Sequence, residues 1–376
     1  MQEIIYLDNA ATTALAPEVK KILVEHLDFF GNPSSIHQLG RTSKALIEQA
    51  RKQIAKYLNA KASEIIFTSG GTEADNMAIH CAIYDLKVKH IISSKIEHPA
   101  VRETLLYYQQ ERQIQVHFLP VDDKGNIFLS DLEAQLAQLS EPVLVSLMHA
   151  NNELGTLLDI EKVAALCQQY QAFLHVDTVQ TFGLLPIDTQ AIPVHFLTAS
   201  AHKFHGPKGI GVLFKKENIA FQHWIKGGGQ ERQMRAGTEN FLGIIGLAKA
   251  IELLEPEKTY SYLEELRTYT WKNLQEKIPN IKMNSPKQGL PSILNIQFPI
   301  FPKEANLLFL LDLQGICVSG KSACASGSTQ PSPILQACGI DTERANVRLS
   351  FSKYTTQQEI DQLVKVLEQI VVPVLV

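Results

Sequence analysis

Short, almost entirely apolar segments alternate with helix-like segments through the middle of this chain, and no other feature constrains its fold as strongly. Six apolar segments are expected to be strands: residues 64–69, 89–94, 142–148, 172–177, 195–200 and 209–214. Helical patterns lie between most of them, at residues 73–86, 100–113, 129–139 and 159–170. Strands that are apolar on both faces must be covered on both faces. The sequence therefore predicts an α/β fold whose mostly parallel sheet is sandwiched by helices.

The pattern changes after about residue 250. A long helical stretch over residues 244–278 leads to strands near 292–298 and 346–352 and to a last helix at 356–370, followed by a packed strand or tail. We expect a large domain over residues 15–250. A smaller α+β domain would combine residues 1–14 with 251–376.

Composition and charge exclude several classes of protein. Of the 376 residues, 45% are hydrophobic and 20% are charged, which is ordinary for a soluble globular chain. The net charge of −4 gives no global positive field for direct binding of nucleic acid. No apolar run is long enough to span a membrane, and the first residues do not resemble a secretory signal. The five cysteines form no CxxC pair and no metal-site spacing, so we expect a reduced, cytoplasmic protein without a metal.

Polar clusters follow the predicted strands one after another. Ligands of open parallel sheets bind outside the carboxyl ends of the strands, so these clusters should converge on one crevice. They are Gly70–Thr72, His98, Asn151–Glu153, Asp177 and His202–Lys203. This convergence predicts a single site that contains all five.

Lys203 and Asp177 are the most informative of these residues. A lysine in a desolvated crevice has a lowered pKa and can bond covalently to an aldehyde. A buried carboxylate such as Asp177 needs a partner, and a protonated ring nitrogen is a suitable one. The alternatives are a surface lysine that follows a strand and an aspartate that caps a helix.

The remaining candidates are each ambiguous alone. The glycine turn before residue 73 suits a phosphate at a helix N-terminus, but an ordinary helix cap is as plausible. His98 precedes Pro99 at a helix start, where it could stack on a flat cofactor or be structural. Arg348 is a charge in an apolar strand, which indicates either an inward guanidinium that needs an anion or an exposed edge.

Two loops complete the set. Residues 227–240 begin with three glycines and carry Arg232 and Arg235, which suits anion binding or a subunit contact. Cys324 lies among small and polar residues between Gly320 and Gly327, so we expect an exposed, mobile loop with a reactive thiol.

With these pieces assembled, the chain resembles the cysteine desulfurases, in the class V aminotransferase group of fold-type I pyridoxal-phosphate enzymes. The resemblance covers nearly the whole chain. Its motifs occur in order: YLDNAATT (6–13), GNPSSIHQLGR (31–41), FTSGGTEADN (67–76), EHPA (97–100), ANNELGT (150–156), HVDTVQ (175–180), SAHKFHGPKGIG (200–211), GGGQERQMRAGTEN (227–240), SGKSACASGS (319–328) and NVRLSFS (346–352).

The resemblance implies a role for each matching residue. Lys203 would hold pyridoxal 5'-phosphate, Cys324 would take the sulfur of L-cysteine as a persulfide, and His98 would stack on the ring and handle protons. Asp177 and Gln180 would bind the ring. The phosphate ligands would be Gly71, Thr72, Ser200, His202 and, from the other subunit of a homodimer, Thr238. The substrate carboxylate would be held by Asn32, Asn152 and Arg348.

The resemblance also implies L-alanine as product and an acceptor protein for the sulfur, either an iron-sulfur scaffold or a tRNA-thiolation enzyme. Two departures concern the cysteine loop, where Lys321 and Gln330 replace residues that are often Ser and Glu in the family. The first could lower the pKa of Cys324, and the second removes a negative charge. The alternatives are a selenocysteine lyase, an aminotransferase, and a non-catalytic binding or scaffold protein on the same fold.

Overall fold

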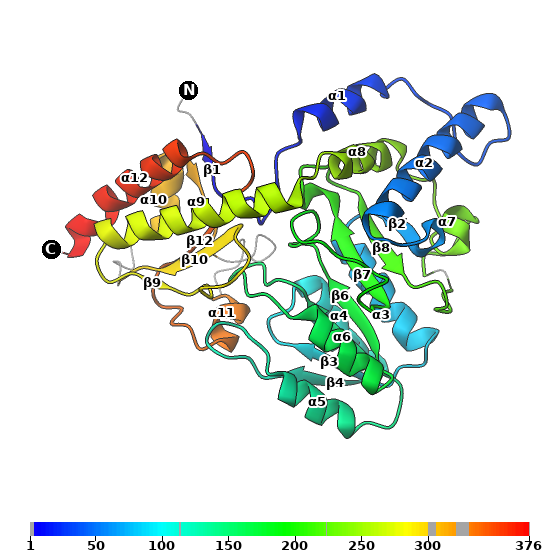
Figure 1. The fold of residues 1–376 in the computed structure, drawn as a ribbon, viewed down its shortest axis with the longest axis horizontal. Coiled ribbons are helices and arrows are strands. Elements are labelled where there is room, and N and C mark those ends of the chain that lie inside the picture. The colour runs from blue at the N-terminus through cyan, green and yellow to red at the C-terminus, as the bar shows by residue number, and fades with distance from the viewer. Residues whose placement is uncertain (1–3, 113, 223, 300–305, 321–330, 376) are drawn as a thin grey trace.

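A seven-stranded sheet forms the centre of the computed structural model, which describes residues 4–112, 114–222, 224–299, 306–320 and 331–375 (Figure 1). The strands in spatial order are β2 (Ile65–Thr68), β8 (Gly211–Lys215), β7 (Phe196–Ser200), β6 (Phe173–Asp177), β5 (Val143–Met148), β3 (His90–Ser94) and β4 (Gln115–Leu119). Strand β8 runs antiparallel to both of its neighbours, and every other pair is parallel. The predicted mostly parallel sheet is confirmed.

Helices cover both faces of this sheet, because successive side chains of each strand point to opposite sides. Ile66 and Leu144 pack against α3 (Gly71–Tyr84) and α4 (Pro99–Arg112) on one face. Phe67 and Val145 belong to the core on the other face. The helices on that side are α2 (Gln38–Tyr57), α5 (Leu129–Ala137), α6 (Ile160–Gln169) and α8 (Phe241–Glu252), and α1 (Pro17–Glu25) packs against α8.

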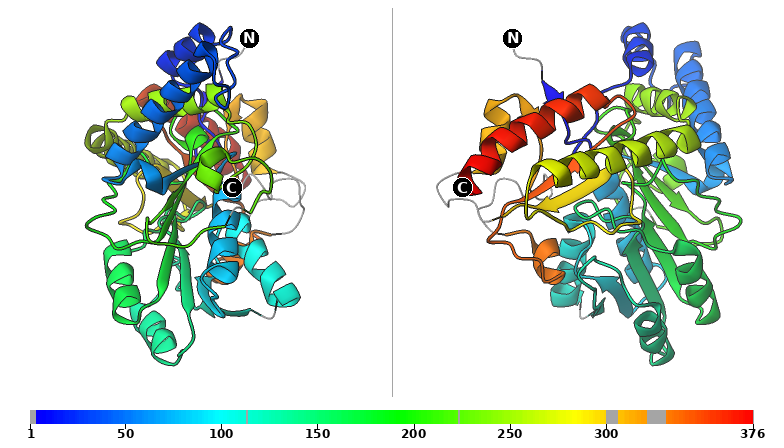
Figure 2. Two further views of the ribbon diagram at one scale, coloured as in Figure 1. Left: turned by 90° about the vertical axis from the view of Figure 1, so that its right-hand side faces the viewer. Right: turned by 60° about the vertical axis from the view of Figure 1, so that its left-hand side comes forward.

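A second hydrophobic core lies beside the first and is built from both ends of the chain. Its three-stranded antiparallel sheet has the order β12 (Asn346–Ser350), β10 (Ile293–Gln297), β9 (Lys282–Met283). Strand β1 (Ile5–Tyr6) pairs in parallel with β11 (Ile316–Cys317). Helices α9 (Pro256–Lys277) and α12 (Gln357–Leu375) run side by side over this core (Figures 1 and 2), and α10 (Leu307–Leu313) joins them. The short α11 (Pro333–Ala337) packs near β3 through Ile96.

The two cores support the division into residues 15–250 and residues 1–14 with 251–376, which stays a prediction. Leu7 belongs to the second core, whereas Val19 belongs to the first. Among the described helices, none is long and apolar enough to cross a membrane.

The structure differs from what the sequence predicts in four places. The helical stretch over residues 244–278 is two helices, because Pro256 disfavours helical geometry in the residue before it and starts α9 instead. Strand β4 was not predicted, since its sequence QVHFL mixes polar and apolar residues. Helix α2 was also missed. The C-terminal tail continues α12 to Leu375 rather than forming a strand, and Pro373 costs it only one hydrogen bond near its end.

Candidate active site at the carboxyl ends of the strands

One cavity of about 140 Å³ lies beyond the carboxyl ends of β2, β5, β6 and β7. Ten of the thirteen predicted site residues line it: Gly71, Thr72, His98, Asn152, Asp177, Gln180, Ser200, His202, Lys203 and Arg348. They come from segments up to 277 positions apart in sequence, from Gly71 to Arg348. Chain folding alone brings them together, as the strand-end argument predicted.

Lys203 is half-buried in the 3₁₀ turn Ala201–Lys203 that follows β7. Its Nζ donates to the carbonyl oxygen of Ala10 at 2.5 Å and to that of Ala11 at 3.0 Å. Gln180 Nε2 donates to the same Ala10 oxygen at 3.1 Å. The N-terminal segment is therefore a wall of the site, and it orients the amine.

Asp177 ends β6 and is almost fully buried, with Oδ1 accepting from the Val179 amide at 2.9 Å. This hydrogen bond caps a turn, not an α-helix, so the predicted alternative of a helix cap is not what the structure has. Burial raises the pKa of Asp177 to about 7, and the nearby Asp75 carboxyl adds to that rise. A cationic partner in the cavity would offset both effects and favour the carboxylate.

Asp75 and His175 are buried beneath Asp177, and the sequence analysis overlooked them. His175 lies on the same face of β6 as Asp177, two residues earlier, and its Nε2 is 3.4 Å from Asp75 Oδ1 on α3. Its Nδ1 is 2.9 Å from Ser146 Oγ, and Nε2 is 3.2 Å from Thr198 Oγ1. Two signals could have indicated this cluster. The alternation of β6 places His175 on the same face as Asp177, and Asp75 stands directly before the mostly apolar part of α3.

His98 stands directly before α4 and lines the cavity. Its Nδ1 accepts from the Ala100 amide at 3.1 Å, which assigns the ring proton of the neutral form to Nε2. Burial lowers the pKa of His98 to about 4, with further lowering by the charges of Lys203 and Arg102. The imidazole is therefore neutral near pH 7.

The glycine turn fits a phosphate. Gly70 offers no capping side chain to α3, so the first-turn amides of this helix lack a side-chain acceptor from the cap position. A Cβ on Gly71 would lie 2.9 Å from Val179 Cγ2, so only a glycine lets the start of α3 approach the turn after β6 this closely. Ser200 and His202 line the same cavity, and His202 Nδ1 is 3.1 Å from Thr12 Oγ1. An amine, a buried carboxyl and a phosphate cradle on one cavity match the donor set that pyridoxal phosphate needs.

Arg348 is fully buried in β12, so its side chain faces the interior and the exposed-edge alternative is wrong. Nη1 donates to the Asn152 carbonyl oxygen at 2.8 Å, and Nη2 donates to Asp8 Oδ1 at 2.7 Å. Nε has no hydrogen-bond partner. The predicted anion partner is thus supplied, in this structure, by the protein's own N-terminal segment.

Three predicted site residues are not part of this cavity. Asn32 is exposed, and its Oδ1 accepts from the Ser34 amide. Thr238 is exposed in a separate hollow that Glu231 and Arg235 also line. Cys324 lies outside the described residues, as do Lys321 and Gln330. The roles of these residues stay predictions.

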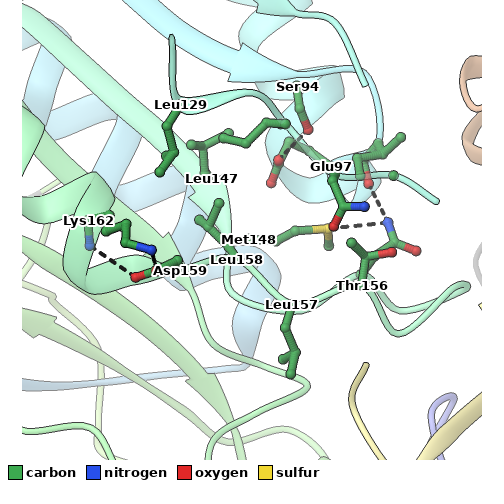
Figure 3. Close-up of a pocket in the computed structure, with 15 residues that line it drawn as sticks. Ser94, Glu97, Leu129, Leu147, Met148, Thr156, Leu157, Leu158, Asp159 and Lys162 are labelled. Atoms are coloured by element: carbon green, nitrogen blue, oxygen red, sulfur yellow. Dashed lines mark hydrogen bonds and ion pairs between the residues drawn. The ribbon is translucent and has the colours of Figure 1, made fainter. Parts of the chain in front are cut away.

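A neighbouring cavity of about 210 Å³ shares Met148 with the first one (Figure 3). Glu97 and Ser94 lie at one end of its lining, with Ser94 Oγ donating to Glu97 Oε1 at 2.6 Å. The Asp159–Lys162 ion pair lies at the other end, beyond Leu129 and Leu147. Burial holds the pKa of Glu97 well above its usual range. Because its lysine is already paired with Asp159 and its lining has no glycine turn at a helix start, this cavity fits the cofactor poorly.

Comparison with known proteins gives a consistent result. Residues 5–363 match the family described as aminotransferase class-V. A protein of Dictyoglomus turgidum named cysteine desulfurase IscS is 42% identical over 99% of this chain and 95% of its own. A solved NifS-like protein has a TM-score of 0.90 and 34% identity, covering 98% of this chain and 99% of its own. The structure of SspA in complex with cysteine has a TM-score of 0.82 and 30% identity, covering 94% of this chain and 100% of its own.

Proposed function

This chain belongs to the class-V aminotransferase family and is a pyridoxal-phosphate-dependent cysteine desulfurase, and from that premise we propose which of its residues perform the reaction. The observation that carries the proposal is the cavity wall shared by the Lys203 amine, the Asp177 carboxyl and the glycine turn at Gly71. The cysteine complex of the similar SspA structure supports L-cysteine as the substrate.

We assign the cofactor's contacts as follows. Lys203 would hold the aldehyde carbon covalently, Asp177 would pair with the ring nitrogen, and Gln180 would bind the ring oxygen. The phosphate would be bound by Gly71, Thr72, Ser200 and His202, with Thr238 contributed by the second subunit of a homodimer. When bound, the cofactor supplies an electron sink that weakens the bonds around the α and β carbons of the substrate.

The protein's own groups would handle protons and the carboxylate. Lys203 Nζ would take the proton from the substrate Cα, since the two carbonyl oxygens of Ala10 and Ala11 already keep the amine at this side of the cavity. The Nδ1 atom of His98 is occupied by the Ala100 amide, so His98 would exchange protons through Nε2. Arg348 and Asn152, with Asn32, would bind the α-carboxylate.

The overall reaction is a sulfur transfer to Cys324. The Cβ–S bond of L-cysteine breaks, an S–S bond to the Cys324 sulfur forms, and the two thiol hydrogens are shared between L-alanine and the persulfide. No external oxidant or reductant is required. The persulfide would then pass its outer sulfur to an acceptor protein, an iron-sulfur scaffold or a tRNA-thiolation enzyme. The four described cysteines are free thiols, which supports our further proposal of a reducing, cytoplasmic location.

The test is a single-turnover reaction with L-cysteine labelled in its sulfur, monitored for alanine and for label retained on the protein. Wild type should form one alanine per labelled Cys324. Cys324→Ala should retain the cofactor but form neither labelled protein nor alanine at the wild-type rate, whereas Cys167→Ala, a buried thiol, should behave as wild type. Lys203→Ala should lose the visible absorbance of the covalently held cofactor. Alanine formed by wild type without labelled protein would contradict the persulfide step, and amino-group transfer that survives Cys324→Ala would indicate an aminotransferase.

A further inference from the structure

Arg348 already has an anionic partner within the protein, the carboxylate of Asp8. Its side chain is 1% exposed although it belongs to the cavity wall, and two of its three nitrogens already donate to protein oxygens at 2.8 and 2.7 Å. The third nitrogen, Nε, is buried without a partner. A guanidinium carries five N–H groups, so a ligand carboxylate at the cavity could use one that remains, but it would share the positive charge with the Asp8 carboxylate.

The two partners differ in their freedom to leave. The Asn152 oxygen belongs to the backbone of a buried residue and cannot turn away. Asp8 uses its side chain, which is 18% exposed and needs only a rotation to reach water. Its backbone is fixed meanwhile, because Leu7 and Asn9 bond to both sides of Ser350 in β12. Asp8 is therefore the partner that can be exchanged.

We propose that Asp8 is a built-in counter-ion of Arg348 that competes with the substrate's α-carboxylate for the charge of the guanidinium. The inference rests on the proposed role of Arg348 and extends it to a residue of the N-terminal segment. Asp8 is a positioning residue, since it acts through Arg348 and does not line the cavity itself. It would set the affinity of the site for amino-acid carboxylates without taking part in bond breaking.

A substitution at Asp8 should therefore change ligand affinity in a defined direction. Asp8→Asn keeps the shape of the side chain but removes its charge, so the contact with Nη2 becomes a weaker, uncharged hydrogen bond. More of the guanidinium charge is then left for the carboxylate of a ligand. We expect L-alanine to bind the holoenzyme about tenfold more tightly and KM for L-cysteine to fall, with little change in kcat.

The experiment measures alanine binding to the holoenzyme by calorimetry and by the rise in melting temperature, with ethylamine as the matched ligand that lacks a carboxylate. Asp8→Asn should strengthen alanine binding and leave ethylamine binding unchanged. Asp341→Asn, which removes the exposed ion pair with Arg344, is the control and should change neither. Equal alanine affinity in wild type and Asp8→Asn would overturn the inference.

Arg348→Gln separates the two proposals. If it does not weaken alanine binding, the proposed role of Arg348 fails, and the inference fails with it. If it weakens alanine binding while Asp8→Asn has no effect, only the role of Asp8 fails. Should Asp8→Asn not fold, Asp8→Glu serves instead: its longer side chain displaces the carboxylate from Nη2, so alanine affinity must change severalfold, and an unchanged affinity would again overturn the inference.

Discussion

Three buried carboxyl groups lie within electrostatic reach of one another: Asp75 and Asp177 line the cavity, and Glu97 lines the neighbouring one. Burial is the main cause that raises the pKa of each, and like charges so close cannot all be ionised without further cost. His175, packed between Asp75 and Ser146, has a pKa lowered by burial to about 4 and cannot act as a permanent counter-charge. At pH 5 these buried carboxyl groups are therefore neutral, and a cation beside Asp177 would favour its ionised form.

The raised pKa of Asp75 can be tested in the cofactor-free protein. Its pKa rises from the ordinary value of 3.8 to about 7 on folding, so the folded state binds an extra proton between these values and the free energy of unfolding falls as pH rises through that window. Asp75→Asn removes this loss, and it also lowers the pKa of Asp177. The variant should gain on the order of 2–4 kcal/mol relative to wild type between pH 5 and pH 8.

Urea unfolding of both proteins at the two pH values measures this difference. The lowered pKa values of His98 and His149 make stability rise with pH below about 6.5. This effect is common to both proteins and cancels in the comparison. A stability difference between the variant and wild type that is the same at pH 5 and pH 8 would show that Asp75 does not titrate in this range.

At the scale of elements, the segment after the three glycines depends on one buried ion pair. Glu231, Arg232 and Gln233 have positive φ values of 44°, 55° and 66°, which side chains rarely adopt. Glu231 is fixed by two hydrogen bonds of 2.7 Å from Arg51 and one of 2.9 Å from the Phe67 amide. The two arginines predicted to bind an anion bond instead to Glu48 and Glu73. This segment leads directly to Thr238.

Glu231→Gln should therefore destabilise the protein strongly. It leaves Arg51, whose side chain is 3% exposed, without its main counter-charge and releases the strained segment, at an expected cost of about 3–5 kcal/mol in the free energy of unfolding. Glu217→Gln, which breaks the exposed ion pair with Lys61, is the matched control and should have no measurable effect. Denaturant unfolding of the two variants and wild type measures the effect. Equal unfolding midpoints for Glu231→Gln and wild type would contradict the prediction.

At the scale of the whole molecule, the N-terminal segment joins the two hydrophobic cores at the site. Strand β1 pairs with β11, and Asp8 and Asn9 bond to β12 of the small sheet. A few residues later, Ala10 and Ala11 bond to Lys203, and Thr13 bonds to the His202 carbonyl oxygen beyond the large sheet. Packing of this segment is thus coupled to the position of the cofactor lysine and of Arg348.

Leu7→Ala should test the coupling. Leu7 is fully buried in the second core, so the truncation should cost about 2–5 kcal/mol in unfolding free energy. It should also weaken retention of the cofactor, because the segment that holds Lys203 loses its anchor. Ile4→Ala, on the same segment but 67% exposed, should change neither quantity. Retention is measured by dialysis and visible absorbance. A destabilised Leu7→Ala protein that keeps its cofactor as tightly as wild type would show that the core and the site are independent.

Most of the fold could be predicted because it depends on local patterns. Residues such as Leu144 and Val145 lie in runs that are apolar on both faces, and only a strand between two layers of helices buries such a run completely. Two local features were missed. Strand β4 mixes polar and apolar residues, and the helix break before α9 comes from Pro256, whose effect was overlooked.

By itself, the sequence determined the order of strands and helices. It therefore determined the edge of the sheet where Lys203, Asp177 and His98 gather, since each stands at a strand end or just beyond one. Only the tertiary structure decided what those residues touch. Asp8 and Arg348 are 340 positions apart, and Asp75 and His175 are 100 apart, so no local periodicity links them. Such contacts depend on how segments far apart in the sequence pack together. A pattern that repeats every two or four residues carries no information about contacts over such sequence separations.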